Sequence, residues 1–278
     1  MHDTLPPSAP LCGFVPDDDA SMRFATGKNH YRLLSDARPW SGARRSESAV
    51  LQRTPPIVQR WQDCVANSVA DAFLYEMVLA GVVPDPAALF SDVARYNAWL
   101  PSRRLIYWNA RALVGAERID AGTQPGAMVR AINEQGFCAE RWCPYDGTPE
   151  ENPFAIHDQA GRMAIDQAGR VELLQCLNFD DVIDALAMHH RVMIGAPVFA
   201  SMQHVGEGEF YVPDGPRLGL HMWQLVGYEE GGNVVRMKNS WLGWGDDNQE
   251  AFAQRSIIER DMISAFAFAR VSPYSEAV

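Results

Sequence analysis

This sequence has few basic residues, no long apolar run and no recognisable export signal. Its 278 residues carry 24 Lys and Arg against 35 Asp and Glu, a formal net charge of −11, so nothing offsets the phosphates of a nucleic acid or an anionic membrane. The longest apolar run, residues 192–200, is far shorter than the ~20 residues that span a bilayer. Residues 1–30 lack both the basic start and the apolar core of a signal peptide. We therefore expect a soluble, cytoplasmic protein that binds neither nucleic acids nor membranes, while secretion without a signal peptide stays open.

Motifs for serine, zinc or phosphate chemistry are missing as well. The sequence has no G-x-S-x-G elbow and no H-E-x-x-H motif, and Gly27-Lys28 lacks the upstream glycine of a phosphate-binding loop. The five cysteines are odd in number and scattered, without a CxxC pair. This pattern fits a reducing compartment in which most thiols are small buried side chains. We expect no metal and no cofactor.

The periodicity of apolar residues changes along the chain. Residues 1–50 are rich in Pro, Asp, Ser and Arg without a sustained period, which indicates a leader packed on the domain, or else a flexible tail. Helices are predicted at residues 64–80, 86–100, 125–135 and 178–187, and strands at 192–198, 223–228, 234–238 and 265–271. Helices that precede strands indicate an α+β fold of two lobes, which we place at residues 51–170 and 171–278.

Three segments carry the residues that an activated thiol requires. Cys64 begins the helix predicted at residues 64–80, where the positive end of the helix dipole stabilises a thiolate. His221 heads one predicted strand and Asn239 follows another. A thiol nucleophile needs a base, and the base needs an orienting partner, so these residues form one possible catalytic set.

Together and in this order, the three segments resemble the papain-like cysteine peptidases in their bacterial form. Gln59–Ser68 resembles the family's cysteine region, Leu220–Tyr228 its H-A-x-x-x-V-G-Y strand, and Lys238–Gly245 its K-N-S-W-G-x-x-W-G motif. The likeness runs from about residue 13 to residue 271. It includes three further segments, which are Gly13–Asp17, Gly122–Pro125 and Cys143–Tyr145.

The resemblance implies a helical lobe and an antiparallel, barrel-like β lobe with the active-site cleft between them. It implies a thiol hydrolase that cleaves peptide bonds in a peptide or protein substrate. Cys64 would be the nucleophile, His221 its acid–base partner, and Asn239 the residue that orients His221. Trp241 would shield the contact between Asn239 and His221 from water.

The turn before Cys64 departs from the family pattern. Val58 stands at the usual spacing of the oxyanion-hole glutamine, whereas Gln59 is one residue too close and Gln62 closer still. We expect Gln59, with Gln62 as the alternative, to donate beside the Cys64 backbone N–H. Asp63 is also unusual there, because a carboxylate next to the nucleophile could raise the pKa of the thiol.

The same resemblance assigns the substrate-binding residues. An apolar pocket narrowed by Met222 indicates a selective enzyme. The stretch before Cys64 is short, so we expect no need of proteolytic activation. The expected substrate contacts are Gly122, Thr123, Pro125, Leu220, Met222 and Trp241.

Two alternatives keep the same residues. A peptide ligase, cyclase or acyltransferase would pass the same acyl-enzyme to an amine. A non-catalytic binding protein on this fold is favoured by the rebuilt turn at residues 59–63.

Overall fold

The computed structural model describes residues 13–16, 31–33, 49–83, 85–156 and 171–271, and the structural statements below are confined to them. Most of the leader predicted for residues 1–50 lies outside the described part of the chain. Its described pieces include two short strands, β1 (Tyr31–Leu33) and β2 (Ala49–Val50), which join the main sheet.

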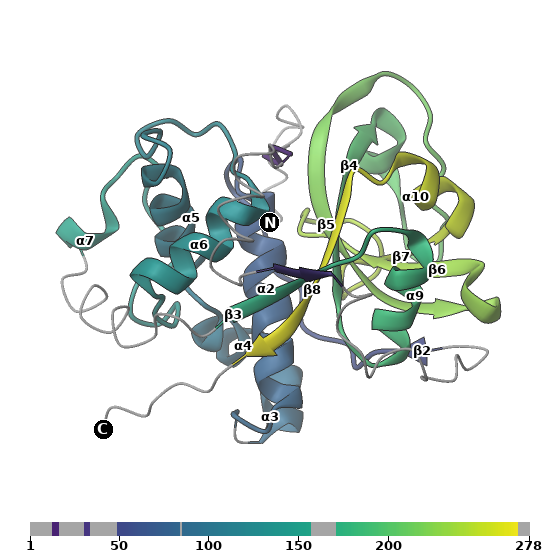
Figure 1. The fold of residues 1–278 in the computed structure, drawn as a ribbon, viewed down its shortest axis with the longest axis horizontal. Helices are drawn as coiled ribbons and strands as arrows, with labels where there is room; N and C mark the ends of the chain where they lie inside the picture. The colour runs from purple at the N-terminus through teal and green to yellow at the C-terminus, as the bar shows by residue number, and fades with distance from the viewer. Residues whose placement is uncertain (1–12, 17–30, 34–48, 84, 157–170, 272–278) are drawn as a thin grey trace, which may run out of the picture.

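Helix α2, Cys64–Leu79, runs between the two halves of the molecule (Figure 1). Its side chains are buried on every face from Cys64 to Met77, so the helix needs packing partners all round. It finds them in helices on one side and in strands of the sheet on the other. The helix ends close to the predicted position, where Gly81 adopts a positive φ of 70°.

The helical half contains two helices that the sequence did not predict, α5 and the short α7. The helix predicted at residues 86–100 is split at Asp92, whose side chain caps the second part by accepting from the N–H groups of Ala94 and Arg95. Helix α5 was missed because it buries arginines, which interrupt the apolar periodicity of its sequence. One of them, Arg103, forms a buried ion pair with Glu140. The helices of this half are α3 (Pro86–Ser91), α4 (Val93–Trp99), α5 (Arg103–Ala112), α6 (Pro125–Gln135) and α7 (Pro153–Ile156).

The strands form one sheet in the order β1-β3-β8-β4-β5-β6-β7, with β2 paired to β5. Neighbours are antiparallel except for β1 and β3. Among the described strands the sheet is open, with β1 and β7 at its ends, rather than closed like a barrel. The remaining bounds are β3 (Val171–Gln175), β4 (Val192–Phe199), β5 (Arg217–Glu229), β6 (Val234–Lys238), β7 (Glu250–Gln254) and β8 (Ser264–Val271), with helices α9 (Phe179–Ala187) and α10 (Arg255–Asp261) and the short 3-10 helices η3 (Ala200–His204) and η4 (Glu230–Gly232).

Most strand predictions are confirmed to within a residue. The exception is β5, which begins at Arg217 and not at residue 223, so His221 lies inside the strand and not at its head. Strands β3 and β7 were not predicted. Both are short and are held by pairing with another strand, β3 with the distant β8 and β7 with the preceding strand β6, which periodicity cannot show.

A buried polar network holds α2 against the sheet. The Ser68 hydroxyl donates to the Met222 carbonyl at 3.1 Å, and the Gln224 amide donates to the Ser68 carbonyl at 3.1 Å and to Asp71 Oδ2 at 2.8 Å. Arg191 donates to the same Asp71 oxygen at 2.5 Å. The helix and strand β5 are therefore held in one register by directional bonds as well as by apolar contact.

Two cations share this network. Burial alone would raise the pKa of Asp71, but Lys238 and Arg191 outweigh it and hold that pKa below its usual value. Lys238 donates to both oxygens of Thr54 and to the Pro55 carbonyl at 2.7–3.0 Å. Since Lys238 precedes Asn239, the network ends beside a predicted site residue.

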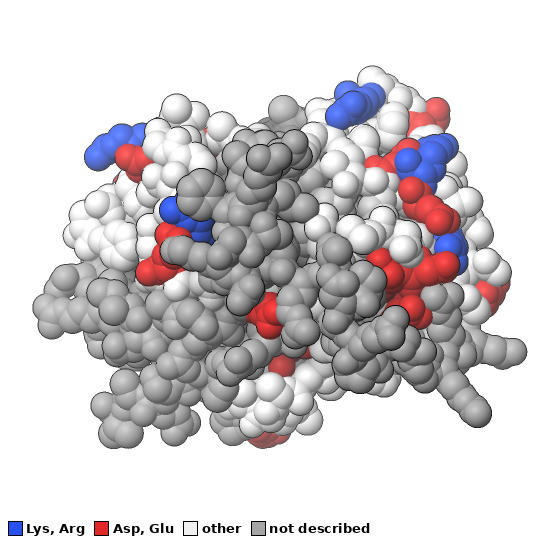
Figure 2. Space-filling view, viewed as in Figure 1, with Lys and Arg blue, Asp and Glu red and all other residues white. Residues whose placement is uncertain are grey.

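The surface shows charges of both signs. On the face in Figure 2, acidic and basic side chains of the strand-rich half lie side by side. Within the described ranges, no helix is both long and apolar enough to cross a membrane.

Breaking the buried network should cost much of the protein's stability. Arg191→Leu leaves Asp71 as a buried carboxylate without its closest cation, so we expect the free energy of unfolding to fall by about 3–5 kcal/mol. Urea unfolding of the parent and the variant measures this loss. The matched control is Arg260→Leu, which removes an exposed pair with Asp261 and should leave the unfolding midpoint in place. Equal losses in the two variants would contradict the prediction.

Candidate active site

Cys64 is the first residue of α2 and is fully buried. The first turn of the helix closes on the Asp63 carbonyl, which accepts from the backbone N–H and the side-chain amide of Asn67 at 3.0 and 3.1 Å. The backbone N–H groups of a first turn point out of the helix end and give it partial positive charge. The predicted position of Cys64 at a helix N-terminus is confirmed.

His221 and Asn239 meet as a hydrogen-bonded pair. His221 Nε2 lies 2.8 Å from Asn239 Oδ1, and the Ser240 backbone N–H donates to the same oxygen at 2.8 Å. A backbone N–H can only donate, so this atom of Asn239 must be its oxygen. His221 Nε2 must then carry a hydrogen, which in the neutral ring leaves Nδ1 as the proton acceptor. Nδ1 has no hydrogen-bond partner within the described structure.

The start of α2 and the histidine belong to the same junction. Ser68 lies one helical turn after Cys64, and the carbonyl to which its hydroxyl donates belongs to Met222, the residue after His221. Cys64 and Met222 also share one apolar core. The contacts of this junction therefore bring together the two elements on which the sequence places nucleophile and base.

The surroundings of His221 keep its ring neutral. Burial lowers the pKa of His221 to about 4, and the hydrogen bond to Asn239 offsets only part of that shift. Trp241 stacks on the imidazole with ring centroids 4.6 Å apart and an interplanar angle of 29°. The indole therefore covers one face of the histidine.

Gln59 lies next to this pair. Its backbone N–H donates to the Ser240 carbonyl at 2.8 Å, and its Oε1 accepts from the Ser240 hydroxyl at 3.0 Å. Its amide nitrogen donates to the Trp61 carbonyl at 2.7 Å. Gln62, the alternative, is tied instead to the helical half, because its backbone N–H donates to the Asp120 carboxylate at 3.0 and 3.2 Å. The structure thus brings Gln59, rather than Gln62, beside Asn239 and Ser240.

Asp63 points away from solvent into a pocket of side chains that sequence reasoning missed. The Tyr145 hydroxyl donates to its Oδ2 at 2.6 Å, and the Arg103 guanidinium lies over the Tyr145 ring, 3.9 Å from its centroid. Burial raises the pKa of Asp63 to about 6, while Tyr145 and Arg103 oppose that shift. In the sequence, Tyr145 was marked only as part of the turn Cys143–Tyr145, and nothing marked Arg103 as a partner of Asp63.

The predicted substrate wall lies on the helical side. The Gly122 N–H donates to the Tyr107 hydroxyl at 3.1 Å, which itself donates to Asp120 at 2.7 Å. Thr123 is buried, and Pro125 is the first residue of α6. One series of hydrogen bonds therefore holds the substrate wall and, through Asp120, also the turn before Cys64.

The other predicted substrate contacts lie on β5 and after β6. Leu220 is half-buried and precedes His221, whereas Met222 is fully buried in the core. Trp241 is half-buried over the histidine ring. The structure brings the wall, β5 and Trp241 around one junction, but it encloses Met222 more completely than a pocket-lining role requires.

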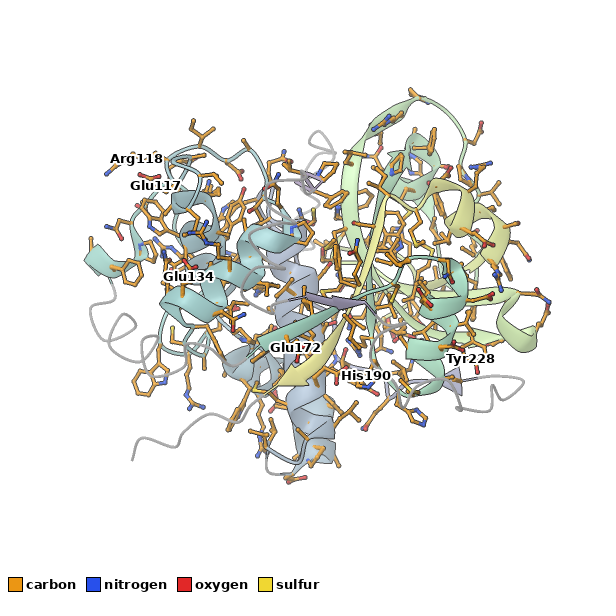
Figure 3. The ribbon with its side chains drawn as sticks, viewed as in Figure 1. Glu117, Arg118, Glu134, Glu172, His190 and Tyr228 are labelled. Carbon is orange, nitrogen blue, oxygen red and sulfur yellow. The ribbon has the colours of Figure 1, made fainter. Side chains whose placement is uncertain are left out.

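His190 lies away from the candidate active site. Its Nδ1 lies 3.0 Å from Glu76 Oε2, beside the C-terminal part of α2 (Figure 3). Twelve residues separate Glu76 from Cys64, about 18 Å along the helix. Within the described ranges, no three His, Cys, Asp or Glu side chains form a group that could hold a metal ion.

Comparisons with known proteins identify the fold. No family model matches the chain. Xylellain, a cysteine protease from Xylella fastidiosa, superposes with a TM-score of 0.74 at 18% identity, over 95% of this chain and 98% of that one. The fold is papain-like. A procathepsin B from Trypanosoma congolense superposes with a TM-score of 0.57 at 16% identity, over 94% of this chain and 82% of that one.

The similarity extends to one curated protein. An uncharacterized peptidase C1-like protein of Acanthamoeba polyphaga mimivirus is 24% identical over 217 residues. The alignment covers 73% of this chain and spans 65% of the length of that relative. The papain-like fold predicted from three short motifs is thus confirmed.

The low pKa of His221 has a measurable effect on stability. In a Cys64→Ala chain no thiolate can pair with the imidazolium, so burial and the weaker opposing hydrogen bond to Asn239 set the pKa of His221. In an unfolded chain the His221 imidazole takes up a proton below about pH 6.5, but in the folded chain it does so only near pH 4. The stabilisation is therefore complete above pH 6.5 and is lost as the pH falls toward 4.

We expect a second substitution, His221→Gln, to remove this loss. Between pH 6.5 and 4, the free energy of unfolding should fall by about 3 kcal/mol more in Cys64→Ala than in Cys64→Ala/His221→Gln. Denaturant titrations at several pH values measure both curves, and every other titrating group cancels in the comparison. Parallel curves would show that His221 is not buried as a neutral ring.

Proposed function

We propose that this protein is a papain-like thiol hydrolase that cleaves peptide bonds in peptide or protein substrates. The observation that carries the proposal is the chain of contacts from Ser240 through Asn239 to His221, which leaves the unprotonated Nδ1 of a buried imidazole at the junction with the start of α2. The papain-like fold and the peptidase C1-like relative support it. A cytoplasmic location remains a prediction from the sequence.

Each step of the reaction has a residue to perform it. His221 Nδ1 takes the proton of the Cys64 thiol, and the thiolate attacks the carbonyl carbon of the peptide bond. The imidazolium then gives that proton to the leaving amine, and water hydrolyses the acyl-enzyme with His221 again accepting a proton. Asn239 keeps the ring in the required tautomer, because its oxygen can only accept from Nε2.

The oxyanion of the tetrahedral intermediate needs two donors. The Cys64 backbone N–H at the positive end of α2 is one, and the Gln59 side-chain amide is the other. An amide nitrogen has two hydrogens, and one of those of Gln59 goes to the Trp61 carbonyl. That contact aligns the group, since it fixes the plane of the amide beside Asn239 and Ser240.

A non-catalytic binding protein remains the second candidate. It is favoured by the same contact between Gln59 and the Trp61 carbonyl, which draws the amide toward the turn. Transfer of the acyl group to an amine would use the same residues, and only the acceptor would differ.

Selective alkylation of Cys64 tests the proposed function. Burial raises the pKa values of Cys138, Cys143 and Cys176 above the ordinary range of a thiol, so these remain protonated. We expect iodoacetamide at pH 6 to modify Cys64 stoichiometrically and at least tenfold faster than these three, as followed by peptide mass mapping. His221→Ala should abolish the preference, and His190→Ala is the matched control that should keep it. Slow labelling spread over all thiols would support the binding protein.

A pair of glutamine substitutions tests the oxyanion donor. Gln59→Ala should lower kcat for a peptide substrate by about 10²–10³ with little change in KM, because the lost bond forms only in the transition state. Gln62→Ala is the matched control and should retain near-parental kcat. The reverse outcome would assign the role to Gln62.

A further inference from the structure

Tyr145 connects the two ends of the turn that precedes Cys64. Its hydroxyl oxygen accepts from the Arg60 backbone N–H at 3.0 Å, and the hydroxyl donates to Asp63 Oδ2 at 2.6 Å. Its ring packs on Trp61, with ring centroids 4.5 Å apart and an interplanar angle of 56°. One side chain of the helical half therefore contacts three of the residues 60–63, and a single hydroxyl bonds to the first and the last of them.

Arg103 holds the flanks of the same turn. Its guanidinium donates to the Val58 carbonyl at 3.3 Å and to Asn67 Oδ1 at 2.9 Å, and the Asn67 amide donates to the Asp63 carbonyl at 3.1 Å. Glu140 orients the guanidinium, because its two carboxylate oxygens accept from it at 2.9 and 2.7 Å. Helix α5 therefore holds both the residue before the turn and the first turn of α2. We call three of these residues the Asp63 cluster, namely Asp63, Tyr145 and Arg103.

The two proposed oxyanion donors lie at the two ends of this turn. The Cys64 backbone N–H directly follows Asp63, and the Gln59 amide donates to the Trp61 carbonyl within the turn. Ser240 of the strand-rich half holds Gln59 from the other side. Residues 60–63 join the two donors, so the conformation of these four residues sets how the donors lie relative to each other. The Asp63 cluster supplies the side chains that hold that conformation.

The Asp63 cluster is closed off from water. Asp63 is fully buried, and only 7% of Tyr145 and 4% of Arg103 is exposed. A hydrogen bond to an ionised carboxylate is stronger than one between neutral groups, and low local polarity strengthens it further. The turn is therefore held more firmly when Asp63 is ionised. The titratable groups around Asp63 are the hydroxyls of Tyr145 and Tyr107, the guanidinium groups of Arg103 and Arg60, the Asp120 carboxylate and the adjacent Cys64 thiol.

We propose that Asp63, Tyr145 and Arg103 are positioning residues of the oxyanion hole, which hold the turn so that the Cys64 backbone N–H and the Gln59 amide converge on the oxyanion. They act through these two donors and do not touch the substrate. The proposal rests on the proposed function and deepens it, because it gives a role to the carboxylate beside the nucleophile.

Two reactions of Cys64 separate the oxyanion hole from the thiolate. Peptide hydrolysis passes through a tetrahedral oxyanion, so it requires both. In alkylation by iodoacetamide a sulfur–carbon bond forms, the carbon–iodine bond breaks, and iodide leaves with the electron pair. No oxyanion forms, so alkylation requires only the thiolate. The ratio of the two rates at one pH therefore measures the oxyanion hole alone, because the fraction of thiolate cancels.

Removal of the Tyr145 hydroxyl should slow hydrolysis without slowing alkylation. In Tyr145→Phe the ring stays, but Asp63 and the Arg60 N–H lose the hydroxyl that they share. We expect kcat for a peptide substrate to fall by about 10–100-fold with little change in KM, a part of what a complete oxyanion donor contributes. The rate at which iodoacetamide alkylates Cys64 should stay unchanged. Tyr211→Phe, which removes a hydroxyl from a buried ring of the strand-rich half, is the matched control and should change neither rate.

The two rates distinguish failure of this proposal from failure of the proposed function. Unchanged hydrolysis in Tyr145→Phe overturns the proposal. An equal fall of hydrolysis and alkylation also overturns it, because such a fall places the effect in the thiolate or in the stability of the fold. Absence of preferential alkylation of Cys64 in the parent protein contradicts the proposed function itself.

The charge of Asp63 allows a test by pH. Burial raises the pKa of Asp63 to about 6, so the carboxylate is ionised above this pH and protonated below it. The ratio of kcat/KM to the alkylation rate should therefore be constant well above pH 6 and fall as the pH falls through 6. In Asp63→Asn the ratio should not depend on pH, because the amide does not titrate. The same fall in Asp63→Asn would assign it to another group and overturn the role of Asp63.

A conservative and a disruptive substitution at Asp63 complete the test. Asp63→Asn keeps an oxygen that accepts from the Tyr145 hydroxyl, whereas Asp63→Ala removes the acceptor. Well above pH 6 we expect the ratio of kcat/KM to the alkylation rate to be highest in the parent, intermediate in Asp63→Asn and lowest in Asp63→Ala. Equal ratios in the three proteins would show that the carboxylate does not position the donors.

Discussion

The contact between helix α2 and strand β5 is the constraint on which the rest of the structure depends. Cys64 belongs to the helix and His221 to the strand, so any slip between the two elements would shift these residues relative to each other. Ser68 and Gln224 bond across this contact, and Asp71 accepts from Gln224 and Arg191 at its centre. Directional bonds specify one register, which apolar packing alone would leave less sharply defined.

Polar groups around the site act in series. The Ser240 N–H determines which atom of Asn239 faces His221, that atom determines the tautomer of the ring, and the tautomer determines which ring nitrogen can accept a proton. Ser240 also binds Gln59 through its carbonyl and its hydroxyl. Ser240 thus links the orientation of the proposed base, His221, to the position of the proposed oxyanion donor, Gln59.

Local signals explain which parts of the molecule were predictable. Helix α2 and strand β6 were predicted nearly to the residue, because their apolar patterns are strong and turn residues bound them. Helix α5 was missed, since Arg103 turns inward to Glu140 and breaks the pattern of an amphipathic helix. Likewise Asp63 was seen as a charge beside the nucleophile, but its partner Tyr145 lies 82 positions away in sequence.

The sequence by itself determined the papain-like fold and singled out Cys64, His221 and Asn239 as candidate residues, because short motifs carry residue type and local backbone geometry together. Only the tertiary structure decided that Gln59 lies beside Asn239 while Gln62 faces Asp120, and that Phe14 lies against Gly195. These outcomes depend on contacts between segments far apart in the chain. Their energies come from burial and hydrogen-bond geometry, which appear only when both segments are in place.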